Sequence, residues 1–283
     1  MNNNQRISIM VPTRERPSEL GLLLQSLRTQ TYQKFDIFIM DDCSGSPLNQ
    51  YHFLQCLIAR LKMEGHKVFM RRNQFMLGVS KVRQAMCDWV LAANNNPLLC
   101  RLDDDIILEP DYLEKLFSGI EKGYDLVSGL TPPIMNQEII RENRFVKPFI
   151  NDVILDKEGN ILKNGDDCGY CYEDSELIPT PHFRSTALYK REIHEKVDYK
   201  SRLSHHGYRE EQIFSFKCLQ NGFKLGVHTG AIVYHLLTPS GGERFSDQNQ
   251  LIAFNEGILK DWTAGQFEMK GDFIQKWKDE VAQ

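Results

Sequence analysis

Three consecutive carboxylates, Asp103, Asp104 and Asp105, are the residues of this chain best suited to chemistry. They follow the short apolar run 98–102, so we expect them at the end of a buried strand, with a helix beginning near Pro110 directly afterwards. Adjacent carboxylates repel one another, and a divalent cation removes that repulsion. Carboxylate oxygens suit magnesium or manganese, which often bridge protein acids and a diphosphate. The alternative is that one Asp caps the next helix while the others are solvated.

Apolar runs alternate with helical patterns through the first half of the chain. The expected strands are residues 6–12, 36–42, 67–70, 98–102 and 125–130, and the expected helices are 18–30 (capped by Ser18), 48–63, 78–92 and 111–122. Strands that alternate with helices at this spacing form parallel βαβ units. Because the strands are unbroken apolar runs, we expect helices on both faces of the sheet. The pattern therefore predicts an α/β fold with a mostly parallel central sheet.

Four of these strands end in polar residues. The four endings are Pro12-Thr13-Arg14, Asp41-Asp42, Arg71-Arg72-Asn73 and the triplet Asp103-Asp104-Asp105. In parallel sheets, ligands bind outside the carboxyl ends of the strands. All four endings are therefore expected at one edge, which is the predicted site. Arg101, one residue before the end of its strand, is unusual in a buried strand and is expected to face a polar gap or the sheet edge.

The organisation changes after Thr131. The expected elements are a hairpin at 153–162, a strand within 182–189, a short helix at 191–197, a helix at 207–221 that carries Glu210 and Glu211, one or two strands at 224–237 that contain His235, and helices at 247–261 and 272–281. We therefore divide the chain into 1–131, 132–246 and 247–283. The last segment is expected to contain only helices.

The 283 residues are 41% hydrophobic and 25% charged, which is enough for one large domain with an elaborated end. The net charge of −4 gives no case for nucleic acid as a general partner. The absence of a long apolar run or a signal peptide predicts a cytoplasmic protein, and peripheral membrane contact stays open. Cys56, Cys87 and Cys218 are expected in the core. Cys168 and Cys171 lack the second ligand pair of a zinc site, so reduced thiols are favoured.

An ordered set of motifs spans roughly residues 6–240. It comprises Ile9–Thr13 with Arg16-Pro17, Gln30–Tyr32, Phe35–Asp42 with Ser44, Asn73, Gly78, Arg83, Leu102–Asp105 and Glu210-Glu211. In order and spacing, this set resembles the family-2 glycosyltransferases of the GT-A fold. Two positions depart from the usual pattern of that family. Arg14 and Glu15 stand where an aromatic residue and Asn are usual, and Glu-Glu replaces the commoner Glu-Asp.

The resemblance implies a nucleoside-diphosphate sugar donor, with UDP as the expected nucleotide, a divalent metal (Mn²⁺ or Mg²⁺), and inversion at the anomeric carbon. It implies a nucleotide-sugar half at 1–131, an acceptor and catalytic-base half at 132–246, and C-terminal helices. By position, it carries over these roles: Pro12, Thr13 and Arg14 in the nucleotide pocket, Asp42 on the base, Arg83 on the nucleotide or its phosphates, Asp103 and Asp104 near the ribose and sugar, Asp105 and His235 on the metal, and Glu211 or Glu210 as catalytic base.

The chemistry of sugar transfer supports these roles independently. A metal neutralises the leaving diphosphate without proton transfer, and a base on the opposite face activates the attacking hydroxyl of a glycan or another acceptor. Acids in a first helical turn are also favoured by the helix dipole alone, which leaves Glu210 and Glu211 open. The competing hypotheses are a nucleotidyltransferase, an aspartyl phosphatase and a catalytically inactive glycan-binding relative. The first lacks its glycine-rich loop after the first strand, and the second would place its Asp pair there.

Overall fold

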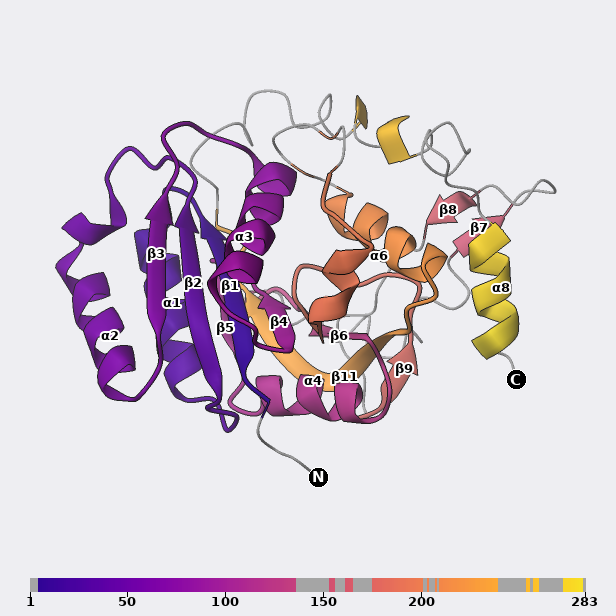
Figure 1. Ribbon diagram of the computed structural model, residues 1–283, viewed down its shortest axis with the longest axis horizontal. Helices are drawn as coiled ribbons and strands as arrows, with labels where there is room; N and C mark the ends of the chain where they lie inside the picture. Colours follow the sequence, from indigo (N-terminus) through magenta and orange to yellow (C-terminus); the bar gives the residue numbers. More distant parts are fainter. Residues whose placement is uncertain are drawn as a thin grey trace.

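The computed structural model describes residues 5–135, 153–155, 161–164, 175–200, 203, 207, 209–238, 253–254, 257–259 and 272–281. These residues form a curled sheet of nine strands with helices on both faces, and a separate two-stranded hairpin (Figure 1). Within these ranges, no helix is both long and apolar enough to cross a membrane.

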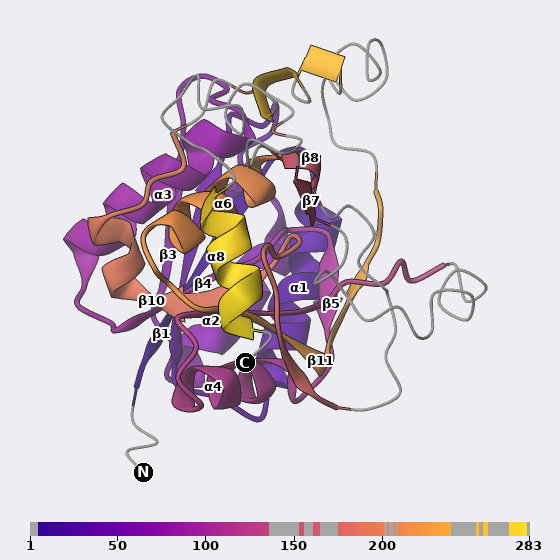
Figure 2. The same ribbon diagram turned by 90° about the vertical axis from the view of Figure 1, so that its right-hand side faces the viewer.

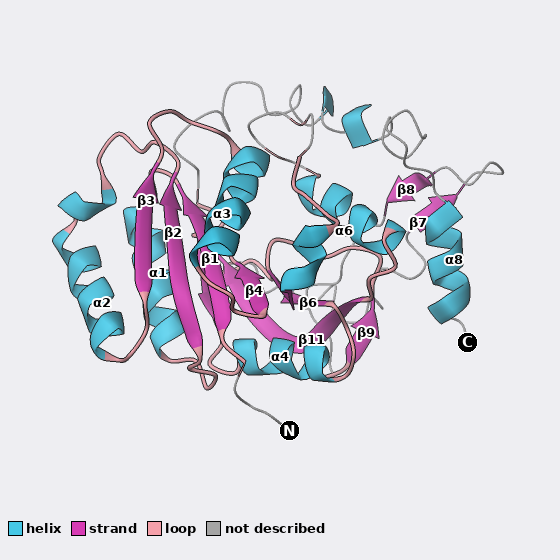
Figure 3. Ribbon diagram, in the orientation of Figure 1, coloured by secondary structure: helices cyan, strands magenta, loops and turns pink. Residues whose placement is uncertain are grey.

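The first half of the chain builds the parallel part of the sheet. Its elements are β1 (Ile7–Thr13), α1 (Pro17–Arg28), β2 (Phe35–Asp41), the 3₁₀ turn η1 (Leu48–Gln50), α2 (His52–Met63), β3 (Val68–Arg72), α3 (Val79–Ala93), β4 (Leu98–Arg101), β5 (Ile106–Leu108), α4 (Tyr112–Glu121) and β6 (Leu126–Leu130). Strands β3, β2, β1 and β4 are neighbours in this order, and each pair is parallel (Figure 3). This arrangement confirms the predicted βαβ units.

The second half completes the sheet. Its elements are β7 (Val153–Leu155), β8 (Ile161–Asn164), β9 (Leu177–Pro179), β10 (Ala187–Lys190), the 3₁₀ helix η2 (Arg191–Glu195), α6 (Glu210–Gln220), β11 (Leu225–His235) and α8 (Asp272–Val281). The antiparallel pair of β7 and β8 confirms the predicted hairpin. Strand β10 lies between β4 and β6 and is antiparallel to both, whereas β11 is parallel to β6. Only β5, β9 and β10 run against the other six strands of the sheet, so it is mostly parallel.

Two apolar clusters cover the two faces of the sheet. In one cluster, buried residues on one face of β1 and β2, such as Ile9, pack against residues of α1, α2 and α4, such as Leu24. The other joins the opposite faces of these strands to α3 and α6, where Phe38, Trp89 and Phe214 are buried. Helices α3 and α6 therefore lie on the same side of the sheet (Figures 1 and 2). The two faces confirm the α/β layering expected from the unbroken apolar strands.

Several local predictions are wrong. The strand β5 was not predicted and lies between the acid triplet and the helix expected at 111–122, because Ile106 and its neighbours pair with the end of β11; the helix itself is confirmed as α4. Ser18 is exposed and does not cap α1, which begins at Pro17, since proline is favoured at the first helical position. The helix expected from residue 48 begins as a 3₁₀ turn, and Cys56 is exposed rather than in the core. The predictions for Cys168 and Cys171 lie outside the described residues.

Candidate active site

The carboxyl ends of the parallel strands meet along one edge of the sheet (Figure 1). The amide of Asp42 donates a hydrogen bond to the carbonyl of Thr13 at 2.8 Å. The amide of Leu102 donates to the carbonyl of Met10 at 3.0 Å. Because the acid triplet follows Leu102 directly, it is fixed beside the end of β1. The edge predicted from the strand endings therefore exists in the folded protein.

Asp103 is held by a hydroxyl group and a guanidinium group. It accepts hydrogen bonds from the hydroxyl of Ser185 and from Nη2 of Arg83. Burial raises the pKa of Asp103, but Arg83 and Arg101 outweigh this effect and lower it to about 2. Asp103 is therefore an ionised carboxylate at neutral pH.

Asp104 and Asp105 share the guanidinium group of Arg16. Nη1 of Arg16 lies 2.8 Å from Oδ1 of Asp104 and 2.9 Å from Oδ2 of Asp105, and all three side chains are buried. Burial raises the pKa of Asp104 to about 6, with Asp105 acting in the same direction and Arg16 opposing them. On its other side, Oδ1 of Asp105 is 3.2 Å from Nε2 of His235. Burial lowers the pKa of His235, but its contact with Asp105 reverses that effect and raises it.

Asp105 and His235 were the two predicted metal ligands, and the fold brings them together although 130 positions separate them in sequence. Oδ2 of Asp105 is buried and accepts no hydrogen bond within the described residues. Oδ1 faces the imidazole and Oδ2 faces Nη1 of Arg16, so a carboxylate and an imidazole nitrogen, both suitable ligands of a divalent cation, lie side by side. Within the described ranges, no group of three His, Cys, Asp or Glu side chains gathers around one point. A cation held by Asp105 and His235 would have further coordination positions for oxygens of a bound diphosphate.

Glu210 lies between two buried arginines. Both of its oxygens accept hydrogen bonds from Arg101, at 2.6 and 3.0 Å, and Oε1 also accepts one from Nε of Arg83 at 2.9 Å. Since Arg83 also donates to Asp103, a chain of ion pairs links α6 to the acid triplet. Of the two alternatives expected for Arg101, a polar gap or the sheet edge, the structure shows a polar cluster. Its strand β4 lies inside the sheet, between β1 and β10. A carboxylate bonded on both oxygens is poorly suited to accept a further proton.

Glu211 differs from its neighbour. Its side chain is about a quarter exposed, and Nη2 of Arg101 lies 3.6 Å from its Oε1. Burial, together with the charge of Glu210, raises its pKa to about 7 in spite of Arg101. A carboxylate with this exposure and a pKa near neutrality suits a general base. The geometry therefore favours Glu211 over Glu210, the choice that the helix pattern left open.

Replacing Glu210 with glutamine should destabilise the protein by about 3–5 kcal/mol, because two buried guanidinium groups lose their shared carboxylate. The matched control is Glu192→Gln, an exposed residue of η2, whose effect should stay within about 0.5 kcal/mol. Guanidinium chloride unfolding followed by circular dichroism measures both changes. A loss below about 1 kcal/mol for Glu210→Gln would contradict a structural role for this ion-pair cluster.

The residues predicted for the nucleotide pocket lie at the ends of β1 and β2. Asp42 accepts hydrogen bonds from the side-chain amide of Asn73 and from the backbone amides of Leu77 and Gly78, at 2.8 to 2.9 Å. It therefore shapes the loop that leads into α3, and a role in base binding stays a prediction. Arg14 is half-buried, and its Nε and Nη1 have no hydrogen-bond partner within the described residues. Pro12 precedes it at the end of β1.

Sequence reasoning assigned no role to Arg16 or Ser185, and both contact the acid triplet. Arg16 is part of the motif Ile9–Thr13 with Arg16-Pro17, but its position there gave no indication of the residues that it contacts. Ser185 carried no signal, because it lies 82 positions from Asp103.

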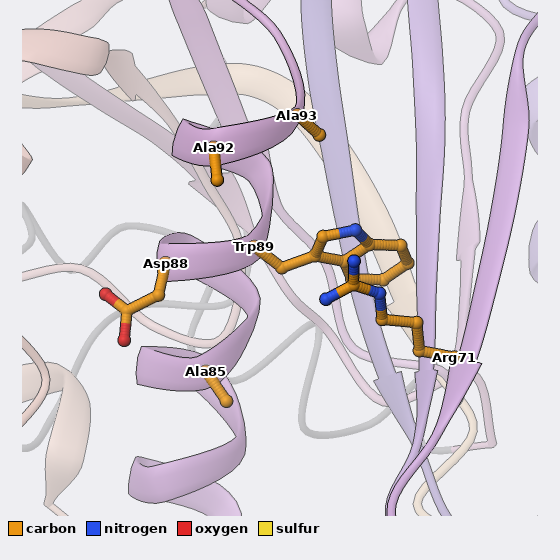
Figure 4. A pocket seen from close by; sticks show the side chains of 6 residues that line it. All are labelled: Arg71, Ala85, Asp88, Trp89, Ala92 and Ala93. Atoms are coloured by element: carbon orange, nitrogen blue, oxygen red, sulfur yellow. The ribbon is translucent and has the colours of Figure 1, made fainter.

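A separate hollow of about 440 Å³ lies between β3 and α3 (Figure 4). It is lined by Arg71, Ala85, Asp88, Trp89, Ala92 and Ala93. The guanidinium group of Arg71 lies 4.4 Å from the centre of the Trp89 ring. Arg71 belongs to one of the four strand endings expected at the site edge, but its side chain faces this hollow instead; the other five lining residues were not predicted as site residues.

The fold and the charge cluster together define a protein of the GT-A glycosyltransferase class. Residues 8–169, more than half of the chain, match the model of glycosyl transferase family 2, and the chain belongs to that family. An uncharacterized glycosyltransferase of Haemophilus influenzae is 30% identical over 124 residues, which are 41% of this chain and 35% of the relative. The matched part is thus about a third of that relative. These findings confirm the resemblance drawn from the sequence.

Solved structures share the fold at low sequence identity. GalNAc-T7, solved with UDP, GalNAc and Mn²⁺, is 16% identical with a TM-score of 0.65, and the match covers 99% of this chain and 57% of that one. TarS of S. aureus is 16% identical with a TM-score of 0.54, over 98% of this chain and 42% of TarS. The mannosyltransferase PcManGT from Pyrobaculum calidifontis, solved with GDP-Man and Mn²⁺, is 12% identical with a TM-score of 0.53, over 84% of this chain and 59% of that one. The shared feature is the α/β fold.

Proposed function

We propose that this protein transfers a glycosyl group from a nucleoside-diphosphate sugar to a hydroxyl group of a glycan or another acceptor, with inversion at the anomeric carbon. UDP is the expected nucleotide, and Mn²⁺ or Mg²⁺ the expected metal. One observation carries the proposal. Glu211, a partly exposed carboxylate with a pKa near 7, adjoins the ion-pair chain that leads to Asp103 at the strand edge. A base and an acid cluster on separate elements suit a single displacement.

The residues divide between donor and acceptor. Glu211 would accept the proton of the acceptor hydroxyl while the hydroxyl oxygen of the acceptor attacks the anomeric carbon. The bond from that carbon to the diphosphate oxygen breaks, and its electron pair leaves with the diphosphate. Asp105 and His235 would hold the divalent cation, which supplies positive charge against the leaving diphosphate. The catalytic base and the metal ligands thus come from different parts of the chain.

The donor pocket is expected around Pro12, Thr13 and Asp42. The half-buried guanidinium of Arg14, with two nitrogens unpaired in the described structure, favours an anionic ligand such as a diphosphate. Arg83 is already bonded to Asp103 and Glu210, so we assign it to positioning these acids rather than to direct phosphate binding. The complexes of GalNAc-T7 with UDP and of PcManGT with GDP-Man support a nucleotide as the donor's leaving part.

A thermal-shift screen of nucleotide sugars, with and without Mn²⁺, tests the proposal. A donor that binds only the folded state at about a hundredfold excess over its Kd stabilises it by about 2.7 kcal/mol. We expect UDP and at least one UDP-sugar to raise the melting temperature only with Mn²⁺. The best donor is then incubated with Mn²⁺ to detect hydrolysis. Cleavage between sugar and diphosphate supports glycosyl transfer, cleavage between the phosphates indicates a nucleotidyltransferase, and a flat screen contradicts the proposal.

A further inference from the structure

Among the described residues, the guanidinium of Arg16 is in direct contact with the predicted metal ligand Asp105. Its Nη1 forms ion pairs with Asp104 at 2.8 Å and with Asp105 at 2.9 Å. Its Nη2 donates a hydrogen bond to the carbonyl of Thr238 at 2.5 Å. The side chain is 7% exposed, so the guanidinium is fixed inside the site rather than solvated. Arg16 therefore supplies the charge that was expected from a metal.

A guanidinium and a divalent cation compete for the same oxygens. Oδ2 of Asp105 forms an ion pair with Nη1 of Arg16 at 2.9 Å without an aligned hydrogen bond, so it is the oxygen for which Arg16 and a metal would compete. A cation bound there would lie close to Nη1, and two positive charges at contact distance repel strongly when both are buried. His235, on the other oxygen of Asp105, adds a third basic group when it is protonated. The carboxylate pair cannot serve Arg16 and a metal equally well.

We propose that Arg16 occupies the cation position at Asp104 and Asp105 in the absence of donor, so that a divalent metal binds tightly only together with a diphosphate. The diphosphate offers metal ligands and, for the displaced guanidinium, a new anionic partner. Metal and nucleotide would then bind with positive coupling, set by one side chain. This inference rests on the proposed function for the diphosphate, whereas the competition between Arg16 and the metal concerns this chain alone.

The test is a Mn²⁺ titration without nucleotide, in which electron paramagnetic resonance measures the free ion. Arg16→Gln should bind Mn²⁺ about tenfold or more tightly than the wild type, a typical coupling between two competing ligands. The matched control is Arg60→Gln, which removes the same charge from α2, where Arg60 pairs with Glu64 rather than with the acid pair. Its Kd for Mn²⁺ should change by less than about threefold, as expected for a screened charge. Equal or weaker Mn²⁺ binding by Arg16→Gln would overturn the proposal.

A second titration, in the presence of UDP, measures the coupling. In the wild type, UDP should tighten Mn²⁺ binding by a clearly larger factor than in Arg16→Gln, because only the wild type has a guanidinium to displace. Equal factors would contradict the competition. If no nucleotide binds, the proposed function fails while the comparison with Mn²⁺ alone still decides the role of Arg16. If neither protein binds Mn²⁺, the competition is wrong and the donor screen decides the function separately.

Removal of Arg16 leaves two buried carboxylates without their shared counter-charge, so Arg16→Gln should melt at a lower temperature than the wild type. Mn²⁺ alone should restore more of the melting temperature of Arg16→Gln than it adds to the wild type. If Arg16→Gln does not fold, Arg16→Lys replaces it. Lysine keeps one positive charge but lacks the second nitrogen that donates to the carbonyl of Thr238, so the charge is held less firmly beside the acids, and the Mn²⁺ affinity of Arg16→Lys should lie above that of the wild type. Wild-type affinity in Arg16→Lys would contradict the proposal.

Discussion

Glu211→Gln should reduce glycosyl transfer by about 10²–10⁴-fold while the donor still binds, because glutamine keeps the shape of the side chain but cannot accept the acceptor's proton. The side chain is partly exposed at the first turn of α6, so its loss leaves no buried charge unpaired. Transfer is measured with the donor that the thermal-shift screen identifies, and donor binding with the same thermal shift. Unchanged turnover would remove Glu211 from the role of base.

The pH profile distinguishes a base from a merely structural acid. The pKa of Glu211 is raised from 4.5 to about 7, and a base acts only when deprotonated. The turnover number of the wild type should therefore fall about tenfold per pH unit below pH 7 and level off above it. Glu211→Asp is the matched control: it keeps the carboxylate, so it should retain partial activity and an acidic limb, which Glu211→Gln lacks.

The same shift predicts an effect on stability. The folded pKa lies above the unfolded value, so ionising Glu211 destabilises the fold as the pH rises from 4.5 through 7. Above pH 7, Glu211→Gln should therefore be more stable than the wild type, by about 1–3 kcal/mol. At about pH 3 the difference should vanish, because the carboxyl group is then largely protonated in both the folded and the unfolded state. Urea unfolding at two pH values measures this, and a pH-independent difference would contradict the raised pKa of Glu211.

Asp105→Ala should abolish the Mn²⁺-dependent thermal shift by UDP and reduce transfer by about 10³-fold. The metal's stabilisation of the leaving diphosphate is worth several kcal/mol, and each 1.4 kcal/mol is a factor of ten in rate. Asp105 is the only one of the three acids that contacts His235 within the described structure, so no neighbour reproduces its position.

Two control variants make this test specific. Asp105→Asn keeps the size of the side chain and one oxygen but removes the charge, so its Mn²⁺-dependent shift should also be lost or strongly weakened. Asp111→Ala removes an exposed carboxylate paired with Lys115 on α4, and should leave the shift intact. A full Mn²⁺-dependent shift in Asp105→Ala would move the metal site elsewhere, even if the sugar-donor proposal held.

The local sequence pattern was sufficient for the parallel part of the sheet. Hydrophobic periodicity and the polar residues that end β1, β2 and β4 are local features of the sequence. They were therefore enough to predict the sheet edge at which the acid triplet lies. The same pattern missed β5, and for the strand expected within 182–189, which contains most of β10, it gave neither the neighbouring strands nor the direction. These short strands are stabilised by partners far along the chain, and β10 reverses the direction of the sheet between β4 and β6.

What the sequence by itself determined is the set of acids at one sheet edge, the family resemblance, and a pair of candidate bases at the start of a helix. What only the tertiary structure decided is how these charges are paired. Arg101 binds Glu210 across 109 positions, and Arg16 binds Asp104 across 88. Sequence periodicity reports only on residues a few positions apart, so it cannot predict pairs this distant. The folded chain brings these charges together, and each pair offsets the desolvation cost of burying its two charges. That pairing separates Glu210 from Glu211 and places Arg16 where a metal was expected.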